Sequence, residues 1–272
     1  MIPSWAVIPV AGHGTRMLPA TSVIPKALLP VGTWPMLHAS LDECVRAGIP
    51  GVVLITGDDQ HLVHEYVDAA LAAGRNDEAG DLGRLGRGLL TMEIVRIEQR
   101  TPGGVGDAFM HAQPVTGADV FAVLLPDNWF DADPPAIAQV AAAYTATGWC
   151  ALGLTAVELD EAHLFGNVGG VDLETLGDRT HRITDLQDKL PGEFPAAAGA
   201  VLRGCARYVV DRRFYDALKA TGPPSTGEWD DVPAFQHLIA TDGLAAREIL
   251  GRHYDVGHPA GYLAAAAYLS DR

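Results

Sequence analysis

Three continuous apolar runs in the first half of the chain constrain its fold more than any other feature. The runs WAVIPV, GVVLIT and VFAVLLPD begin at Trp5, Gly51 and Val120, and they alternate with segments of helical periodicity. Strands that are apolar at every position are typical of a parallel sheet buried on both faces. The alternation therefore predicts an α/β fold with a mixed, mostly parallel central sheet and helices on both of its faces.

The segments between these runs are predicted to be helical, except for a strand at LTMEIVRIEQ (residues 90–99), whose residues alternate, and for one glycine-rich segment. Residues 35–49 and 61–74 carry apolar side chains at helical spacing, and Gly48 and Gly74 are predicted to end the two helices. Residues 75–88, RNDEAGDLGRLGRG, are polar and rich in glycine. That composition predicts a mobile connection or a short broken helix.

The second half is richer in predicted strands, which are WCALGLTAVE, VGGVDLE, HRITDLQ and AVLRGCARYVV. Helices are predicted around DRRFYDALKA and DVPAFQHLIAT and at the end of the chain. No repeat, low-complexity tract or linker rich in proline and serine interrupts the sequence. We therefore predict a single domain over residues 1–272, with a nucleotide-type half at 1–130 and a strand-rich half at 131–272.

Composition excludes several classes of protein. The net charge is −15 and no basic run is present, which argues against a nucleic-acid partner. The negative net charge is still compatible with a small anionic ligand, provided that Arg and Lys side chains gather in one pocket. Cys44, Cys150 and Cys205 lie far apart without metal-ligand spacing, which fits free thiols in a reducing cytoplasm. Because no signal-peptide pattern or membrane-length apolar stretch occurs, a cytoplasmic protein without a membrane partner is predicted.

A glycine-rich stretch, AGHGTR, follows the first apolar run directly and so falls at the ligand-binding edge of the predicted sheet. Gly12 and Gly14 leave backbone N–H groups open to an anion, Thr15 and Arg16 add side-chain donors, and Lys26 adds a charge. Such turns are also glycine-rich for steric reasons, so phosphate binding and a purely steric role both stay open. The dinucleotide fingerprint and the Walker A motif do not match, which argues against a nicotinamide dehydrogenase.

Other polar residues also follow predicted strands. Asp127 directly follows an apolar strand at the ligand-binding edge of the predicted sheet, where a lone carboxylate can also simply cap the next segment, and Asp255 follows a short run in a similar way. Gln99 ends a strand, and its amide offers the donor and acceptor that a pyrimidine imide edge needs. A solvent-exposed strand end is the alternative for Gln99. The ten histidines show no ligand spacing, and no pattern supports a nucleophilic Ser or Cys.

The long stretch VIPVAGHGTRMLPATSVIPKALLPVGTWPML resembles the signature of bacterial UTP–glucose-1-phosphate uridylyltransferases, members of the sugar-1-phosphate nucleotidyltransferase superfamily. Further segments match that family in order, and together they span nearly the whole chain: EQRTPGGVGDAF, AVLLPDNWF, DKLP, CARYVV and YDVGHPAGYLAA. The resemblance implies a Rossmann-like nucleotidyltransferase fold whose strand-rich extension binds the sugar. It also implies a homo-oligomer, since similar enzymes are often dimers or tetramers.

The resemblance assigns roles to the residues of the nucleotide half. The loop that cradles the triphosphate corresponds to Ala11, Gly12, Gly14 and Thr15. Its catalytic cations correspond to Arg16 and Lys26. The base, uracil or thymine, is read by Gln99 and by backbone near Gly104. Mg²⁺ is the implied cofactor, and its ligands correspond to Asp127 and Asp255.

The sugar half departs from the family pattern. Lys189 in LQDKLP resembles the Lys that contacts the sugar phosphate, but Asp188 and Leu190 replace the Glu and Pro beside it. The glycine that contacts the sugar is matched by Gly166 or Gly169, and we predict Gly169. Ala27 and Pro233 stand where the family usually has acids.

The predicted reaction is attack by a sugar-1-phosphate oxygen on the α-phosphorus of a nucleoside triphosphate, which gives a nucleotide-sugar and pyrophosphate. UTP and glucose-1-phosphate are the predicted substrates, and Lys189 holds the attacking phosphate. Two alternatives stay open. One is the same chemistry with dTTP or another triphosphate and an unusual sugar or cyclitol phosphate. The other is a paralogue that binds nucleotide-sugars without catalysis.

Overall fold

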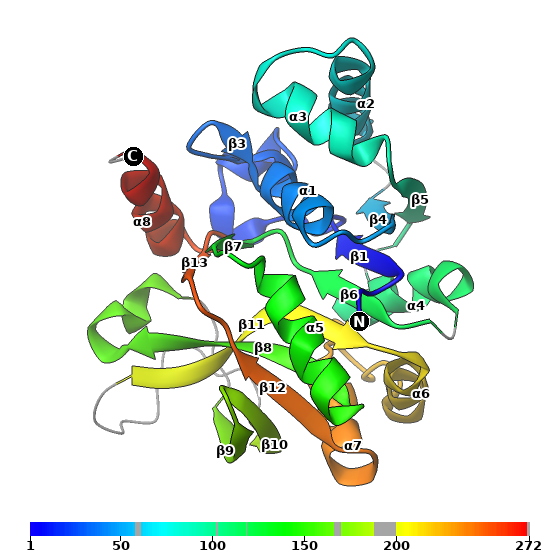
Figure 1. The fold of residues 1–272 in the computed structure, drawn as a ribbon, viewed down its shortest axis with the longest axis vertical. Helices are drawn as coiled ribbons and strands as arrows, with labels where there is room; N and C mark the ends of the chain where they lie inside the picture. The colour runs from blue at the N-terminus through cyan, green and yellow to red at the C-terminus, as the bar shows by residue number, and fades with distance from the viewer. Residues whose placement is uncertain (58–60, 102, 118, 166–169, 188–199, 271–272) are drawn as a thin grey trace.

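A nine-stranded sheet runs through the described part of the molecule in the order β5-β4-β1-β6-β11-β8-β12-β10-β9 (Figure 1). The computed structural model describes residues 1–57, 61–101, 103–117, 119–165, 170–187 and 200–270. Within these residues, no helix is both long and apolar enough to cross a membrane.

The first half of the chain forms the parallel part of this sheet. Its strands are β1 (Trp5–Pro9), β4 (Gly51–Gly57), β5 (Glu93–Gln99) and β6 (Phe121–Leu124). β1 is parallel to both of its neighbours, and Val7 is paired with Val53 on β4 and with Val123 on β6. All three valines are completely buried, which explains why these strands are apolar at every position.

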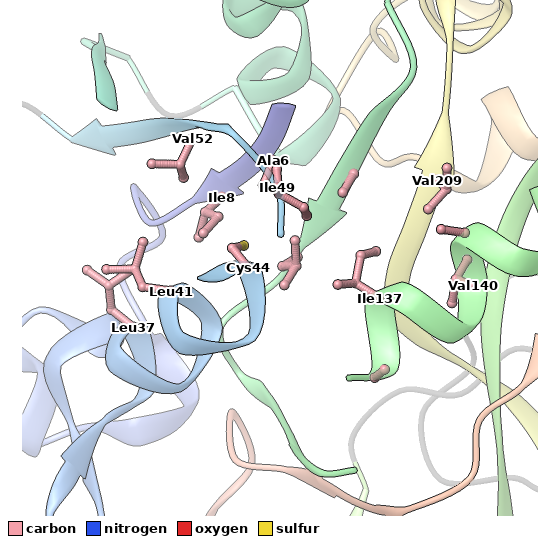
Figure 2. Close-up of a cluster of buried hydrophobic side chains, with 14 of the residues drawn as sticks. Ala6, Ile8, Leu37, Leu41, Cys44, Ile49, Val52, Ile137, Val140 and Val209 are labelled. Carbon is pink, nitrogen blue, oxygen red and sulfur yellow. The ribbon is translucent and has the colours of Figure 1, made fainter. Parts of the chain in front are cut away.

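Helices cover both faces of the sheet, as predicted. One face carries α1 (Met36–Arg46), α2 (His61–Arg75), α3 (Gly80–Leu89) and α5 (Ala136–Thr147). The other carries α4 (Val105–Thr116), α6 (Arg212–Thr221) and α7 (Val232–Thr241). On the first face, side chains of β1, β4 and α1 meet those of α5 and β11 in one core (Figure 2).

The second half adds the antiparallel part of the sheet. β11 (Ala200–Val210) is antiparallel to both β6 and β8 (Cys150–Glu158), and β12 (Leu244–Glu248) is parallel to β8. β10 (Thr180–Leu186) and β9 (Val171–Gly177) complete this edge. The strand-rich extension is therefore continuous with the central sheet.

Several short elements lie at the carboxyl edge of the sheet. The loop after β1 contains the 3₁₀ turns η1 (Thr15–Met17), η2 (Ala20–Ser22) and η3 (Lys26–Leu28). Two small ribbons follow the main strands, and η4 (Leu159–Leu164) and the final helix α8 (Pro259–Ser270) lie nearby. The ribbons pair β2 (Pro30–Val31) with β3 (Trp34–Pro35) and β7 (Asn128–Asp131) with β13 (Arg252–Asp255).

The glycine-rich segment at 75–88 differs from the prediction. Residues 80–88 belong to the continuous helix α3 and Arg75 is the last residue of α2, so only residues 76–79 connect the two helices. Gly74 lies one residue before the end of α2, close to the predicted helix end. A Cβ on Gly86 would lie 1.8 Å from the carbonyl oxygen of Ala70, and one on Gly74 would lie 2.3 Å from the carbonyl carbon of Gly86. These glycines therefore allow α2 and α3 to pack backbone against backbone.

Candidate active site

A cavity of about 370 Å³ opens at the carboxyl ends of β1, β5 and β6. This is the sheet edge at which the sequence patterns predicted ligand binding. The predicted residues that line the cavity come from three separate segments of the chain: Ala11, Gly12, Arg16 and Lys26 from the first, Gln99 and Gly104 from the second, and Asp127 from the third. The structure thus brings most of the predicted nucleotide-binding residues together.

Two glycines of the loop after β1 have different surroundings. Gly14 has φ 65°, and a Cβ on it would lie 2.9 Å from both Lys26 Cβ and Thr21 Cγ2. Gly14 is thus needed for the path of the loop, and neither it nor Thr15 is among the described residues lining the cavity. By contrast, a Cβ on Gly12 would meet nothing within 4 Å, so its backbone is open to a ligand.

A carboxylate and two cations form the charged centre of the cavity. Lys26 Nζ donates to Asp127 Oδ2 at 2.5 Å, and Arg16 Nη2 lies 3.9 Å from the same oxygen. Burial alone would raise the pKa of Asp127, but the charge and hydrogen bond of Lys26, helped by Arg16, lower it to about 2. Asp127 is therefore a carboxylate throughout the neutral pH range.

The ribbon of β7 and β13 brings the second predicted metal carboxylate to the same place. Asp255 is paired with Asn128, and the N–H of Val256 donates to the carbonyl of Asp127 at 2.8 Å. Asp255 is 7% exposed. Asp127 and Asp255 both line a second cavity of about 390 Å³, which shares Arg16, Leu125, Asp127 and Glu228 with the first.

These two carboxylates fit the requirements of Mg²⁺, which usually takes one or two carboxylates together with phosphate oxygens and water. In the described part of the chain, no group of three or more His, Cys, Asp or Glu side chains could hold a metal. A metal bound here would therefore complete its coordination with oxygens from substrate or water.

Arg207 and Glu43 form a buried ion pair that the sequence patterns did not identify as part of the site. Arg207 Nη2 donates to Glu43 Oε2 and to the carbonyl of Asn128, both at 2.8 Å, and Nη1 donates to the carbonyl of Leu125 at 3.2 Å. The guanidinium thus holds both ends of the turn that carries Asp127. CARYVV was a family match, but nothing in it indicated this contact.

Asn128 and His253 hold the Asp127 side chain itself. Asn128 Nδ2 donates to Asp127 Oδ1 at 2.9 Å, and His253 Nε2 lies 2.9 Å from Asn128 Oδ1. Since the carboxylate can only accept, the amide oxygen faces His253, which must donate from Nε2. Burial, with the charges of Arg203 and Arg207, keeps the pKa of His253 well below its usual value. The sequence analysis also missed Asn128 and His253. Asn128 is adjacent to Asp127 in sequence, but nothing in the sequence indicated that Asn128 would connect Asp127 to His253.

The surroundings of Gly257 explain why the motif YDVG, which contains the predicted metal ligand Asp255, ends in a glycine. A Cβ at this position would lie 2.7 Å from Asp127 Oδ2 and 2.7 Å from Lys26 Nζ. Any side chain there would therefore displace the ion pair at the centre of the cavity. The signal for it was present in YDVG, where the sequence reading singled out the aspartate alone.

Gln99 is 3% exposed and lines the first cavity. Its Nε2 donates to the carbonyl of Gly104 at 3.2 Å and to Asp107 Oδ2 at 2.6 Å. Gly104 has φ 97°, and a Cβ on it would lie 2.5 Å from the backbone nitrogen of Trp229. The loop at the start of α4 is therefore packed against the segment around Trp229.

The sugar side of the site is described only in part. The predicted residues Lys189, Asp188 and Gly169 lie outside the described residues. Within those described, the second cavity is lined by Arg203, which is 6% exposed and sits over the ring of Phe165 with its Cζ 4.5 Å from the centroid. The sequence patterns did not identify this buried cation.

Comparison with known proteins places these features in a family. The family model described as nucleotidyl transferase matches residues 5–272. UTP–glucose-1-phosphate uridylyltransferase 2 of Staphylococcus saprophyticus is 30% identical over 95% of this chain and 89% of its own length. A UTP–glucose-1-phosphate uridylyltransferase of Bacillus subtilis is 30% identical over 95% of this chain and 88% of its own.

Solved structures agree with the fold. A UDP-glucose pyrophosphorylase crystallised with UDP-glucose has a TM-score of 0.85 and 24% identity, with all of both chains covered. A UTP-bound enzyme of the same type from Acinetobacter baumannii has a TM-score of 0.80 and 27% identity, covering 99% of this chain and 93% of its own. The predicted nucleotidyltransferase fold is confirmed.

Proposed function

This chain belongs to the nucleotidyl transferase family, and from that premise we propose that it transfers the uridylyl group of UTP to glucose-1-phosphate. The products are UDP-glucose and pyrophosphate. The observation that carries the proposal is the convergence of Gly12, Arg16, Lys26 and Asp127 on one cavity at the carboxyl edge of the sheet. The relatives and structural neighbours named for this reaction or its nucleotides support the choice of substrates.

Electrostatic repulsion is the main obstacle to this reaction. The attacking sugar phosphate is already an anion, so no general base is needed. Two unit charges about 4 Å apart repel by about 4 kcal/mol at an effective dielectric near 20. Arg16 and Lys26 would stabilise the charge that builds on the leaving pyrophosphate, and Lys189 would hold the acceptor phosphate in line. Catalysis is then a matter of positioning and charge stabilisation.

Mg²⁺ is the cofactor that this proposal requires. Asp127 and Asp255 would hold it, and when bound it supplies positive charge at the phosphates. The lowered pKa of Asp127 keeps that ligand ionised, and the contacts from Asn128 and Lys26 fix its orientation. Residues 1–130 would bind the nucleotide, and residues 131–272, with Gly169, Asp188 and Lys189, would bind the sugar phosphate.

Pyrophosphate release tests the proposal directly. The purified chain is incubated with Mg²⁺ and with UTP, dTTP, CTP, GTP or ATP, each against glucose-1-phosphate and a panel of other sugar and cyclitol phosphates. We expect the highest rate with UTP and glucose-1-phosphate, and none from Asp127→Asn. A higher rate with another pair would reassign the substrates. Binding of UDP-glucose without release from any pair would support the non-catalytic alternative.

A further inference from the structure

The side-chain amide of Gln99 is held in one orientation by two acceptors. Its Nε2 donates both to the carbonyl of Gly104, at 3.2 Å, and to Oδ2 of Asp107, at 2.6 Å. A carbonyl and a carboxylate can only accept hydrogen bonds, so the NH₂ group must face them. Turning the amide over would place its oxygen against two other oxygens. The orientation therefore follows from the chemistry of its neighbours.

This orientation decides what Gln99 can offer a ligand. Both N–H bonds of the amide are directed to the protein, and no hydrogen bond from the described residues reaches Oε1. The residue lines the first cavity and is otherwise buried. What remains for a ligand in this cavity is thus a hydrogen-bond acceptor, whereas the amide was expected to offer both a donor and an acceptor.

Asp107 acts on the ligand only through Gln99. It is not among the described residues that line the cavity, and its carboxylate lies in the first turn of α4. An acid in a first turn is often explained by the helix dipole alone. Here, however, the carboxylate makes its short contact with the Gln99 amide, and its other neighbour is His111 Nε2 at 3.6 Å. Asp107 is therefore a positioning residue.

We propose that Asp107 fixes the base specificity of the site by making Gln99 an acceptor. Uracil and thymine carry a hydrogen on N3 and can donate to Gln99 Oε1. Cytosine has a lone pair on N3, so it would place acceptor against acceptor. This inference rests on the proposed function, because it assumes that the base enters the first cavity. It adds that the Asp107–Gln99 pair rejects cytidine nucleotides.

Direct binding of UTP and CTP measures this selectivity, because the two bases differ at this edge. Titration calorimetry with Mg²⁺ and without sugar phosphate avoids turnover. We expect the wild type to bind UTP on the order of 10- to 100-fold more tightly than CTP, the usual penalty for an unpaired buried polar group. In Asp107→Asn one of the two groups that hold the Gln99 NH₂ becomes an amide that can also donate, so only the Gly104 carbonyl still opposes turning of the Gln99 side chain. The preference for UTP should then fall at least about 3-fold below that of the wild type.

A matched control separates this role from a structural one. His111→Ala removes the other neighbour of Asp107 and should keep the preference for UTP. Asp107→Asn that folds normally yet keeps the full preference would overturn the inference, and so would equal binding of UTP and CTP by the wild type. If the chain prefers UTP but releases no pyrophosphate with any acceptor, the proposed function fails and the specificity inference stands. Binding of neither nucleotide would overturn both.

Discussion

At the scale of single residues, the site depends on the carboxylate of Asp127, whose orientation is fixed by its neighbours. Asp127 receives a hydrogen bond on Oδ2 from Lys26 and another on Oδ1 from Asn128. The backbone of its turn is held from both sides by Arg207. A carboxylate placed in this way has little rotational freedom, which is a requirement for holding a metal against a triphosphate.

Removing Lys26 should change how stability depends on pH. The pKa of Asp127 is about 2 in the folded chain against an ordinary 3.8, so the ion pair stabilises the fold above pH 4 and is lost as the pH falls toward 2. Lys26→Met should therefore lower the free energy of unfolding at pH 7 by on the order of 2 kcal/mol. Urea unfolding from pH 7 to pH 3 should show this difference shrinking below pH 4.

The exposed Lys219 offers a control for that measurement. Lys219→Met removes the same charge from the surface of α6 and should leave stability within about 0.5 kcal/mol at every pH. An equal effect of the two substitutions, or a Lys26→Met difference that does not vary with pH, would contradict the assigned cause of the pKa shift.

Arg16 should matter for turnover more than for folding, because its side chain is half exposed and lies 3.9 Å from Asp127. Arg16→Ala should lower kcat at least about 10²-fold, the loss typical of a preorganised donor to transition-state charge. The melting temperature should stay close to that of the wild type. Steady-state pyrophosphate release measures the first quantity, and turnover within a fewfold of the wild type would remove Arg16 from catalysis.

His253 should affect the metal requirement through Asn128. His253→Phe keeps a ring beside Phe130 and Phe165 but has no donor for Asn128 Oδ1. The half-saturating Mg²⁺ concentration should rise roughly 10- to 100-fold, as for other lost partners of metal ligands. His253→Gln can still donate from its amide and should recover most of the loss. Similar values for both variants would mean that the ring serves packing alone.

At the scale of elements, Glu43 and Arg207 connect the site to the core. Glu43 on α1 accepts from Arg207 on β11 and from the N–H of Ile137 in the first turn of α5. The pair is almost completely buried, with side-chain exposures of 1% for Arg207 and 6% for Glu43. A buried pair of this kind contributes little net stability, but breaking it leaves an uncompensated charge.

A double-mutant cycle should expose that asymmetry. Glu43→Gln or Arg207→Met alone should lower the free energy of unfolding by about 3 to 5 kcal/mol, and the double variant should lose less than the sum. Urea unfolding of the four proteins gives the coupling directly. Additive losses would show that the two side chains do not stabilise each other.

An element could be predicted where its own sequence shows the pattern of its burial, and it could not where packing against other elements decides its structure. The strands β1 and β4 were predicted because burial on both faces makes them apolar throughout. α3 was predicted wrongly, because Gly83 and Gly86 look like helix breakers in sequence and act as contact points in the fold. α5 was not predicted, since AIAQVAAAYTAT is apolar on nearly every side and lacks a helical pattern.

At the scale of the whole molecule, the site is assembled from segments far apart in sequence. Gln99, which ends β5, and Asp127, which follows β6, could be predicted because the ends of the strands and the family motifs locate them, and Lys26 could be predicted from its family motif. The roles of His253 and Arg207 could not, because these side chains contact Asn128 and Glu43 across 79 to 164 residues of sequence. Asn128 is adjacent to Asp127, but the orientation of its amide depends on the distant His253. Sequence patterns report local structure and carry no record of such distant partners.

Because the site is assembled in this way, nucleotide and nucleotide-sugar ligands should protect different parts of the chain from hydrogen exchange. The first cavity is built from the loop after β1, the Gln99–Gly104 loop and the turn of Asp127, with Glu228 from the second half. UTP alone should therefore slow amide hydrogen exchange in residues 10–29 and 99–107. Through the backbone contacts of Trp229 with Gly103 and Gly106, it should also do so around residue 229.

UDP-glucose should extend that protection to the second cavity, whose lining includes Arg203 and Gly204 on β11 and Asp255 on β13. Hydrogen-exchange mass spectrometry with each ligand, at concentrations well above Kd, separates the two patterns. Protection of β11 and β13 by UTP to the same degree as by UDP-glucose would contradict a division into nucleotide and sugar halves. If both ligands protect only the first cavity, the sugar does not bind in the second cavity. That result would also contradict the division, because the acceptor must lie beside Asp127 and Asp255 to reach the α-phosphorus.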